Sequence, residues 1–517
     1  MVRQSDNNSI VTDMDTDTDK KTDKKADKEN VRRGLRARGI CVIIPVYNNV
    51  GTVGRVVSDV LAYCSDVIVV DDGSDDGTAA VLSSFSDIHV VTLPVNGGKG
   101  HALKCGFAKA LSLGFSYAVT LDADGQHYAS DIPAFLDASI RWPGAVILGN
   151  RRRDSIHRSA GSNFANHFSN FWFFVQTGRR LPDTQTGYRL YPLRRLHGFR
   201  LMTSRYEAEL ELIVFASWHG VDIHTVPVDV YYPPEEERVS HFRPAADFTR
   251  ISILNTLLCV LAVVYGLPLR LWRLLAACLR TMVAVLFFLF ASFFVMLPAA
   301  WLIMRRPGPS ATRRIHKLIY LMSRFVTLRL GVPGAHFSNS IAGSAFERPS
   351  VVICNHQSHL DLIYLLSLTP KMVFLTNDRV WHSPFYGYLI HHAEYYPVSM
   401  GIDSLLPRLR DLMSRGYSIA LFPEGTRSAD CRIGRFHRGA FYLAHRLGCG
   451  ITPVFLYGTG RVLPKHGHVF RKSEVFMEVQ KARQCDDSEP LGEQTRFFRH
   501  YYQNHFRELC DRLDRLA

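Results

Sequence analysis

The stretch DVIVVDDGSDDGT, residues 66–78, decides the fold of the first part of the chain. Its four consecutive apolar residues run into two aspartates and then into a turn rich in Gly, Ser and Asp. A hydrophobic run without polar alternation is typical of a strand in a parallel sheet that is covered on both faces. The residues that follow favour a tight turn for local reasons. We therefore predict a buried strand whose carboxyl end presents Asp71 and Asp72.

The same pattern recurs on both sides of this stretch. Further strands are predicted in ICVIIPV (40–46), IHVVTLP (88–94), YAVTLDAD (117–124) and AVILGN (145–150), with helical patterns between them. Alternation of strand and helix predicts an α/β doubly wound, Rossmann-like domain, in which ligands bind at the carboxyl ends of the strands. We place this domain at residues 39–249.

Polar residues follow the predicted strands at these carboxyl ends. Asp71 and Asp72 can accept hydrogen bonds from the N–H of a base or from ribose hydroxyls. Asp122 and Asp124 are two positions apart, so their carboxylates are expected to project to one side and hold a divalent ion that bridges phosphates. Taken singly, each motif could equally be a plain Asp-rich turn.

A second α/β pattern begins after Arg314, and we place a second domain at residues 307–517. Strands are predicted in PSVVICN (349–355), KMVFLTN (371–377), YSIALFPEG (417–425), GITPVFLYG (450–458) and SEVFMEV (473–479), and a helix in residues 495–516. No internal repeat relates the two halves.

The motif CNHQSHLD, residues 354–361, follows the first strand of this second domain. His356 is expected in the loop after the strand and Asp361 near the first turn of the next helix. A carboxylate placed there can orient the imidazole while His356 takes a proton from an acceptor hydroxyl that attacks a thioester. The structural alternative for an isolated His and Asp is set aside because FPEGTRS, residues 422–428, follows another predicted strand and offers an arginine to an anionic group.

Charge and cysteine usage narrow the class of protein. The net charge of +14 favours nucleic acid, anionic lipid or phosphorylated small molecules. The ten cysteines are scattered without a CxxC pair, which indicates reduced thiols in a cytosolic environment and argues against a zinc site. No recognisable nucleic-acid module is present, so we expect no nucleic-acid partner.

Residues 1–38 are predicted to be a disordered polar tail, because they are rich in Asp, Thr and Lys and lack the apolar run of an export signal. The basic stretch VRRGLRARG at its end reads as a solvated linker or as a contact to anionic headgroups.

Residues 250–306 are predicted to be membrane-associated helices. Residues 251–269 and 281–304 hold no charged residue, and the second segment is long enough to span a bilayer. We expect an apolar helical hairpin, either spanning or lying in the membrane plane; a buried hairpin in a soluble core is the alternative. Arginines flank both segments, so their distribution does not set an orientation.

The motifs PVYN, VVDDGSDDGT, NGGKGHALK, LDAD and TQTGYR together resemble family 2 glycosyltransferases with the GT-A fold, closest to the dolichyl-phosphate-mannose-synthase-like branch. The resemblance implies a nucleotide-sugar donor, a lipid acceptor, and Mg²⁺ or Mn²⁺ held by Asp122 and Asp124, with Asp124 catalytic. Glu207 and Glu209 are candidate bases, although an anionic acceptor phosphate would need none. The implied nucleotide-sugar-binding residues are Pro45, Tyr47, Asn48, Asp71, Asp72, Lys99, Asp122 and Arg189.

The pair HX4D and FPEGTRS resembles the lysophosphatidate-type acyltransferases of glycerolipid synthesis. This resemblance implies His356 as base, Asp361 as its partner, acyl-CoA or acyl-carrier protein as donor, and no cofactor. The implied acyl-acceptor-binding residues are Glu424, Gly425, Thr426 and Arg427, and Pro453 falls in the family's last block. His359 lies outside the motif's spacing. YYPVSMG, residues 395–401, departs from the family, since Ser399 and Met400 stand where an acid and a phosphate-reading arginine are expected; lysophosphatidate is therefore predicted to be a poor acceptor.

The sequence thus predicts a bifunctional, membrane-associated enzyme of lipid or glycolipid biosynthesis, a glycosyltransferase and an O-acyltransferase in one chain. Both soluble domains are expected to face the cytosol at the inner membrane. The domain order is similar to that of bacterial fusions from aryl-polyene and related envelope-lipid pathways. The alternative is a glycosyltransferase whose acyltransferase-like half is an inactive lipid-binding anchor.

Overall fold

The computed structural model describes residues 27–151, 160–231, 244–328, 335–337, 344–384, 386–484 and 489–516. The chain divides into two compact units. The first comprises Met1–Trp272 together with Asp511–Ala517, and the second comprises Arg273–Cys510. Each unit contains one seven-stranded sheet.

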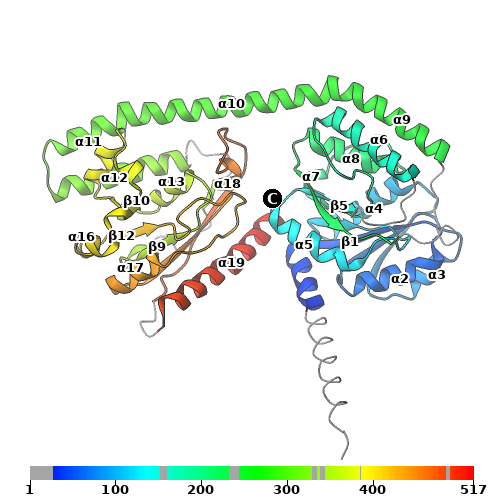
Figure 1. The fold of residues 1–517 in the computed structure, drawn as a ribbon, viewed down its shortest axis with the longest axis horizontal. Helices are drawn as coiled ribbons and strands as arrows, with labels where there is room; N and C mark the ends of the chain where they lie inside the picture. Colours follow the sequence, from blue (N-terminus) through cyan, green and yellow to red (C-terminus); the bar gives the residue numbers. More distant parts are fainter. Residues whose placement is uncertain are drawn as a thin grey trace, which may run out of the picture. The chain divides into compact units, whose positions relative to one another are not determined.

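The first sheet, which contains the strands labelled β1 and β5 in Figure 1, has the strand order β3-β2-β1-β4-β6-β5-β7. All neighbouring strands are parallel except β6, which runs antiparallel to β4 and β5. The five strands predicted from the sequence are present, so the doubly wound α/β domain is confirmed; β6 and β7 were not predicted. The strands are β1 (Ile40–Val46), β2 (Val67–Asp71), β3 (Ile88–Thr92), β4 (Tyr117–Thr120), β5 (Val146–Arg151), β6 (Arg189–Pro192) and β7 (Ile223–Val228).

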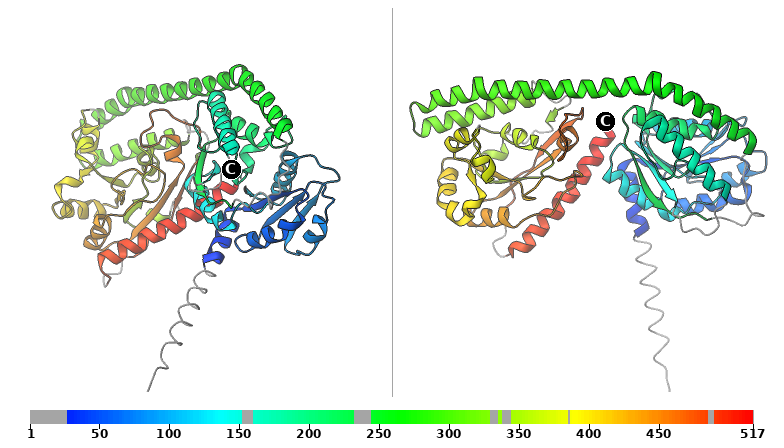
Figure 2. Two further views of the ribbon diagram at one scale, coloured as in Figure 1. Left: turned by 45° about the vertical axis from the view of Figure 1, so that its right-hand side comes forward. Right: turned by 45° about the horizontal axis from the view of Figure 1, so that its top comes forward.

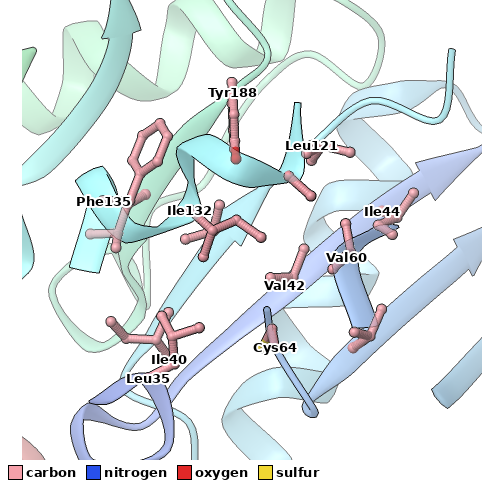
Figure 3. Packing of buried hydrophobic residues seen from close by; sticks show 14 of the residues in the cluster. Leu35, Ile40, Val42, Ile44, Val60, Cys64, Leu121, Ile132, Phe135 and Tyr188 are labelled. Carbon is pink, nitrogen blue, oxygen red and sulfur yellow. The ribbon is translucent and has the colours of Figure 1, made fainter. Parts of the chain in front are cut away.

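Strand β1 shows why this sheet is covered on both faces. Its even-numbered residues, including Ile40, Val42 and Ile44, pack into one hydrophobic cluster with Phe135 (Figure 3). Its odd-numbered residues, Cys41 and Ile43, belong to a second cluster on the other face. Helices α2 (Val50–Leu61) and α5 (Ile132–Arg141) supply the first face, and α4 (Lys99–Ser112) and α8 (Glu207–Trp218) supply the second.

Part of the predicted disordered tail is ordered. Residues 27–38 form a helix, in which the side chains of Leu35 and Arg38 are buried. Leu35 joins the cluster of Figure 3, and the Arg38 guanidinium donates to the carbonyl of Ser139 at 2.9 Å. The basic stretch therefore packs on the first unit instead of forming a solvated linker, because its apolar residue has a core to enter. Residues 1–26 lie outside the described residues.

The second sheet has the strand order β11-β10-β12-β9-β13-β14-β8. Its pairs are parallel apart from β13 with β14. The five predicted strands are again present, as is the C-terminal helix α19 (Leu491–Leu516). The strands are β8 (Ala335–Phe337), β9 (Val351–Cys354), β10 (Met372–Thr376), β11 (Tyr396–Pro397), β12 (Ser418–Leu421), β13 (Ile451–Tyr457) and β14 (Val475–Val479).

The predicted apolar hairpin is absent from the described residues, because residues 247–304 form one continuous helix (Figures 1 and 2). The run consists of α9 (Pro244–Leu261), α10 (Leu267–Phe290) and α11 (Leu297–Met304), joined by the π-helical turns Ala262–Gly266 and Ala291–Met296. It is long and apolar enough to cross a membrane, and little of it is buried. The two α/β domains are thus separated by a long helical region.

The two prolines of this run do not end the helix. Pro268 and Pro298 each lack an N–H and would leave an earlier carbonyl unbonded within an α-helix. Each follows one of the π-helical turns by two residues. A π-turn shifts the hydrogen-bond register and so accommodates the proline without ending the helix.

Candidate active sites

The carboxyl ends of β2 and β4 gather the acidic residues that were predicted for the first site. Asp71 is the last residue of β2, and Asp122 and Asp124 lie in the loop that follows β4. Lys99 begins α4 and Glu209 lies in the first turn of α8, so elements distant in sequence meet at this edge of the sheet.

Lys99 links two carboxylates at the centre of this site. Its Nζ lies 2.7 Å from Asp122 Oδ1 and 2.8 Å from Glu209 Oε2. Burial lowers the pKa of Lys99, but the two carboxylates outweigh that effect and raise it above its ordinary value, so the lysine is charged. Lys99 therefore organises the acidic edge directly, and Glu209, as its partner, is a poor candidate for a free base.

The residue environment fits a divalent cation at Asp122 and Asp124. Burial and the charge of Asp122 raise the pKa of Asp124 to about 6, because two carboxylates crowd a site shielded from water. Hard oxygen donors suit Mg²⁺ and Mn²⁺, and Mg²⁺ is commonly held by one or two carboxylates plus substrate phosphates. Among the described residues no group of three or more His, Cys, Asp or Glu could hold a metal. The pair would therefore share the ion with the donor's phosphates.

Gly187, in the TQTGYR motif, lies so close to the acidic cluster that a side chain would not fit at this position. A Cβ at this position would collide with the Asp122 carboxylate and would approach Lys99 Nζ to 2.7 Å. The motif thus brings the backbone before β6 against the acidic cluster.

Arg189 is a correction to the sequence prediction. Its side chain is 1% exposed, and it donates to the carbonyls of Thr184 at 2.9 Å and Glu209 at 2.7 Å. A guanidinium engaged in this way ties β6 to α8 and is not available to a pyrophosphate or an acceptor. The sequence could not reveal this structural role, because an arginine next to a glycine-containing turn looks the same whether it binds phosphate or links two elements of the fold.

Two further predicted nucleotide-binding residues are also engaged in the protein. Both oxygens of the buried Asp72 carboxylate accept from backbone N–H groups, those of Gly97 at 2.9 Å and Gly98 at 2.7 Å. The Asn48 amide exchanges two hydrogen bonds with Asp75. These hydrogen bonds shape the loops around the site; nucleotide contact by Asp72 and Asn48 stays a prediction.

The remaining predicted residues of this site lie along its edge. Pro45 is buried within β1, and Tyr47 follows that strand in the loop. Asp71 Oδ1 accepts from the N–H of Ser74 at 3.0 Å, which fixes the turn after β2. Glu207 is buried at the start of α8.

The second site forms where β9 ends and α13 (Leu360–Leu366) begins. His356 Nδ1 lies 2.8 Å from Asp361 Oδ2, and the same oxygen accepts from the N–H groups of Gln357 at 2.6 Å and Ser358 at 2.8 Å. The fully buried Asp361 thus fixes the imidazole with Nδ1 protonated, which leaves Nε2 as the basic nitrogen. This arrangement is the one expected of a general base and its partner.

The FPEGTRS motif supports His356 from a second direction. The Phe422 ring stacks on the imidazole, with ring centroids 3.9 Å apart and an angle of 13° between the rings. Glu424 accepts from the N–H groups of His356 at 3.0 Å and Gly434 at 2.9 Å. Burial raises the pKa of Glu424 to about 7, although these two N–H groups oppose the shift. Glu424 therefore couples two loops, while the sequence had suggested contact with the acceptor.

The rest of that motif presents polar and cationic groups beside the histidines. Gly425 has a φ of +64°, a left-handed conformation that favours glycine. Burial lowers the pKa of His359, and the charge of Arg427 lowers it further, so Arg427 is near that histidine. Lys465 Nζ lies 3.3 Å from the hydroxyl of Thr426, and sequence reasoning missed this lysine because it belongs to no motif.

Three other positions named from the sequence can be placed. His359 is the residue before α13, but its side chain makes no capping hydrogen bond. Pro453 lies within the buried strand β13. Ser399 donates a hydrogen bond to the carboxylate of Asp378. The segment in which relatives carry a phosphate-binding arginine therefore makes a local polar contact in this chain.

Comparison with known proteins identifies the families of both domains. Residues 41–194 match the family described as glycosyl transferase family 2, and residues 334–457 match the family described as acyltransferase. The chain is 31% identical over 204 residues to the polyprenol monophosphomannose synthase of Mycolicibacterium smegmatis, covering 36% of this chain and 75% of that protein. The chain belongs to the family 2 glycosyltransferases, and it carries an acyltransferase domain as well.

Relatives of the second domain are acyltransferases. The chain is 35% identical over 135 residues to a chloroplastic 1-acyl-sn-glycerol-3-phosphate acyltransferase of Arabidopsis thaliana, covering 24% of this chain and 38% of that protein. The chain thus spans less than half the length of this relative.

A crystal structure of glucosyl-3-phosphoglycerate synthase from Mycobacterium tuberculosis, with Mn²⁺, uridine diphosphate and phosphoglyceric acid, is 17% identical with a TM-score of 0.36; the match covers 46% of this chain and 82% of that one.

Proposed function

We propose that the chain is a bifunctional transferase of lipid or glycolipid biosynthesis. Its first domain would transfer a sugar from a nucleotide-sugar to a lipid-linked acceptor, and its second would transfer an acyl group from acyl-CoA or acyl-carrier protein to a hydroxyl. One observation carries the proposal: a single chain holds both the Asp122–Lys99–Glu209 cluster and the His356–Asp361 pair, each at the carboxyl edge of its own sheet.

At the first site a divalent ion held by Asp122 and Asp124 would neutralise the donor's diphosphate as it leaves. Lys99 keeps Asp122 ionised and oriented through its 2.7 Å contact. If the acceptor is a lipid phosphate, its oxygen is already anionic and attacks without a protein base. That chemistry is consistent with the engagement of Glu209 by Lys99.

At the second site His356 Nε2 would take the proton of the acceptor hydroxyl as its oxygen attacks the thioester carbonyl. The carbon–oxygen bond forms, the carbon–sulfur bond breaks, and the imidazolium returns the proton to the leaving thiolate. Asp361 stabilises the imidazolium through the 2.8 Å contact to Nδ1. No covalent enzyme intermediate is required.

The acyl acceptor is the less defined substrate. The block around Ser399 supplies no arginine, which favours a glycosylated or otherwise less charged lipid. Lys465 beside Thr426 nevertheless adds a second cation near Arg427, which would suit a phosphate-bearing acceptor. We retain the less charged lipid as the proposed acceptor, with the product of the first site as one candidate. The link to aryl-polyene or related envelope-lipid pathways rests on domain order alone.

Purified full-length protein tests these assignments directly. It should transfer labelled sugar from a nucleotide-sugar to a polyprenyl phosphate in a divalent-ion-dependent reaction, and labelled acyl groups from acyl-CoA to a hydroxyl lipid. A panel containing lysophosphatidate and neutral glycolipids identifies the acceptor class. Sugar transfer without acyl transfer to any member would favour the alternative of an inactive, lipid-binding second domain.

We further propose that the long helix lies in the membrane plane, so that both domains face the cytosol at the inner membrane. The outward face of α10 is apolar, whereas the more covered face carries Arg270, Arg273 and Arg280. A helix surrounded by water shows the reverse pattern, and lipid is the solvent that suits this one. The exposed apolar residues of α10 include Leu271, Trp272, Leu275, Leu279, Met282, Leu286 and Leu289.

Two features oppose a perpendicular crossing. A crossing through the first half of α10 would place Arg270, Arg273 and Arg280 in the bilayer, where an arginine at the centre costs about 2.5–3.5 kcal/mol. The uncharged stretch after Arg280 also packs on its own unit: Phe287 contacts Phe325, Phe288 contacts Tyr386, and Thr281 accepts from the N–H of Phe470 at 2.9 Å. These contacts along one face of the stretch favour a helix that lies beside its own unit over one that crosses a bilayer.

A further inference from the structure

The first unit has a cavity that neither catalytic site uses. Its volume is about 340 Å³, and it lies beside the first residues of β7, including His224. β7 runs parallel to β5, so these residues mark the amino ends of the strands. The sugar-transfer residues Asp71 and Asp122 lie at the carboxyl ends. The cavity is therefore at the opposite edge of the sheet from that site. Its lining residues are Phe173, Arg179, Arg180, Leu181, Asp222, Ile223 and His224.

Positive charge from two elements converges on this cavity. Arg179 and Arg180 line it from the loop after α6 (Ala160–Thr177). Arg270, from the start of α10, places its Nη1 3.8 Å from where a Cβ of Gly178 would lie. Burial and the charge of Arg179 lower the pKa of Arg270. Such a cluster is repulsive unless an anion joins it.

An aromatic platform extends the cluster. His224 stacks on Trp142, with ring centroids 4.2 Å apart and 7° between the rings, and the Arg141 guanidinium lies 4.5 Å above the Trp142 ring. Burial lowers the pKa of His224; the charge of Asp222 opposes this effect, and the charges of Arg179 and Arg141 reinforce it. Arg179 and Arg141 therefore both lie near His224.

Protein carboxylates do not balance this charge within the described residues. Asp222 is the acid that the structure gives to the cluster, at 3.8 Å from Arg179, and its side chain is 65% exposed. Arg180 rests over the ring of Phe174, and Arg270 donates to the hydroxyl of Ser217 at 3.2 Å. The cation–π and hydroxyl contacts leave guanidinium N–H groups for an anion.

The position of Arg270 indicates which anion this is. The next two residues, Leu271 and Trp272, are 51% and 70% exposed and belong to the apolar face proposed to enter the leaflet. A helix in the membrane plane holds such residues at the boundary between headgroups and acyl chains, with its basic residues at headgroup level. The cavity then opens where lipid phosphates are concentrated.

We propose that Arg179, Arg180 and Arg270 form a binding site for the headgroup phosphate of an anionic phospholipid. The inference rests on the proposed membrane-plane helix and adds a specific lipid contact to it. Such a site would fix the height and rotation of the first unit on the leaflet, with the sugar-transfer site at the opposite edge of its sheet.

Vesicle binding of the full-length protein tests this site. We compare phosphatidylcholine vesicles with and without phosphatidylglycerol, using wild type and the double variant R179Q/R180Q. The variant should lose about tenfold or more in affinity for the anionic vesicles, as expected for two arginines at a membrane surface. It should bind the neutral vesicles as wild type does.

The control is R33Q/R36Q, which removes the same charge from the helix of residues 27–38, away from α9 in every view (Figures 1 and 2). Equal losses in both variants would overturn the site and leave only general electrostatic attraction. Binding of inorganic phosphate at the cluster without any loss of vesicle binding in R179Q/R180Q would overturn the lipid assignment. Failure of wild type to bind any vesicle would instead contradict the membrane-plane helix.

Discussion

His356 and His359 are three residues apart but have different surroundings. His356 faces Asp361 at 2.8 Å and stacks on Phe422, whereas the His359 side chain is exposed and makes no capping bond. We expect His356→Ala to lower acyl transfer by about 10²–10⁴-fold, the usual contribution of a general base. His359→Ala, the matched control, should retain nearly full activity. Thiol release from acyl-CoA measures both, and similar losses would contradict the assignment.

Glu424 should make the free energy of unfolding depend on pH. Its pKa is raised from 4.5 to about 7, mainly by burial. A carboxyl whose pKa is raised on folding stabilises the fold below its unfolded pKa, and this contribution is lost as pH rises through the folded pKa. Between pH 4.5 and pH 7 the wild type should lose about 3 kcal/mol relative to Glu424→Gln. Denaturant unfolding of both proteins over this range measures it; a constant difference would contradict the shift.

At the residue scale, sequence spacing was enough to predict a contact where it limits the geometry. His356 and Asp361 meet because a strand end and the next helix turn are separated by a short loop. Arg189, Asp72 and Glu424 were identified as functional residues, but each has a backbone partner that is distant in sequence. Motif reading cannot separate a group that shapes a loop from one that contacts a substrate, because both sit in the same segment.

At the scale of elements, the strands were the most predictable features. Continuous apolar runs such as ICVIIPV and GITPVFLYG coincide with β1 and β13, because a strand buried on both faces permits few polar residues. The hairpin was wrong because two uncharged segments separated by arginines look like two helices. The connector contains strong helix formers, and π-helical turns absorb both prolines, so the helix continues.

Cys278 tests the depth of that helix. Among the described cysteines it is the exposed one, and it lies on α10 between the exposed Leu275 and Leu279. A fluorophore attached there should be quenched by lipids labelled near the headgroup, because an in-plane helix enters about 5–10 Å into the headgroup and acyl boundary. Strongest quenching by labels at the end of the acyl chain would indicate a crossing. Labelled Cys278→Ser protein provides the background from other thiols.

At the scale of the whole molecule, one chain combines two chemistries with different requirements. The first depends on carboxylates and a divalent ion, and the second on an imidazole and its buried partner. Asp124 and His356 belong to different compact units. Substitutions at well-separated sites that share no partners act independently, so the two activities should separate by mutation.

The central claim is that both sites are catalytic, and paired assays on two full-length variants test it most directly. Asp124→Ala should abolish divalent-ion-dependent transfer of sugar from a nucleotide-sugar to a lipid acceptor while acyl transfer from acyl-CoA continues at the wild-type rate. His356→Ala should do the reverse. If either substitution silenced both activities in folded protein, or if each left both activities intact, the assignment of two independent active sites would be contradicted.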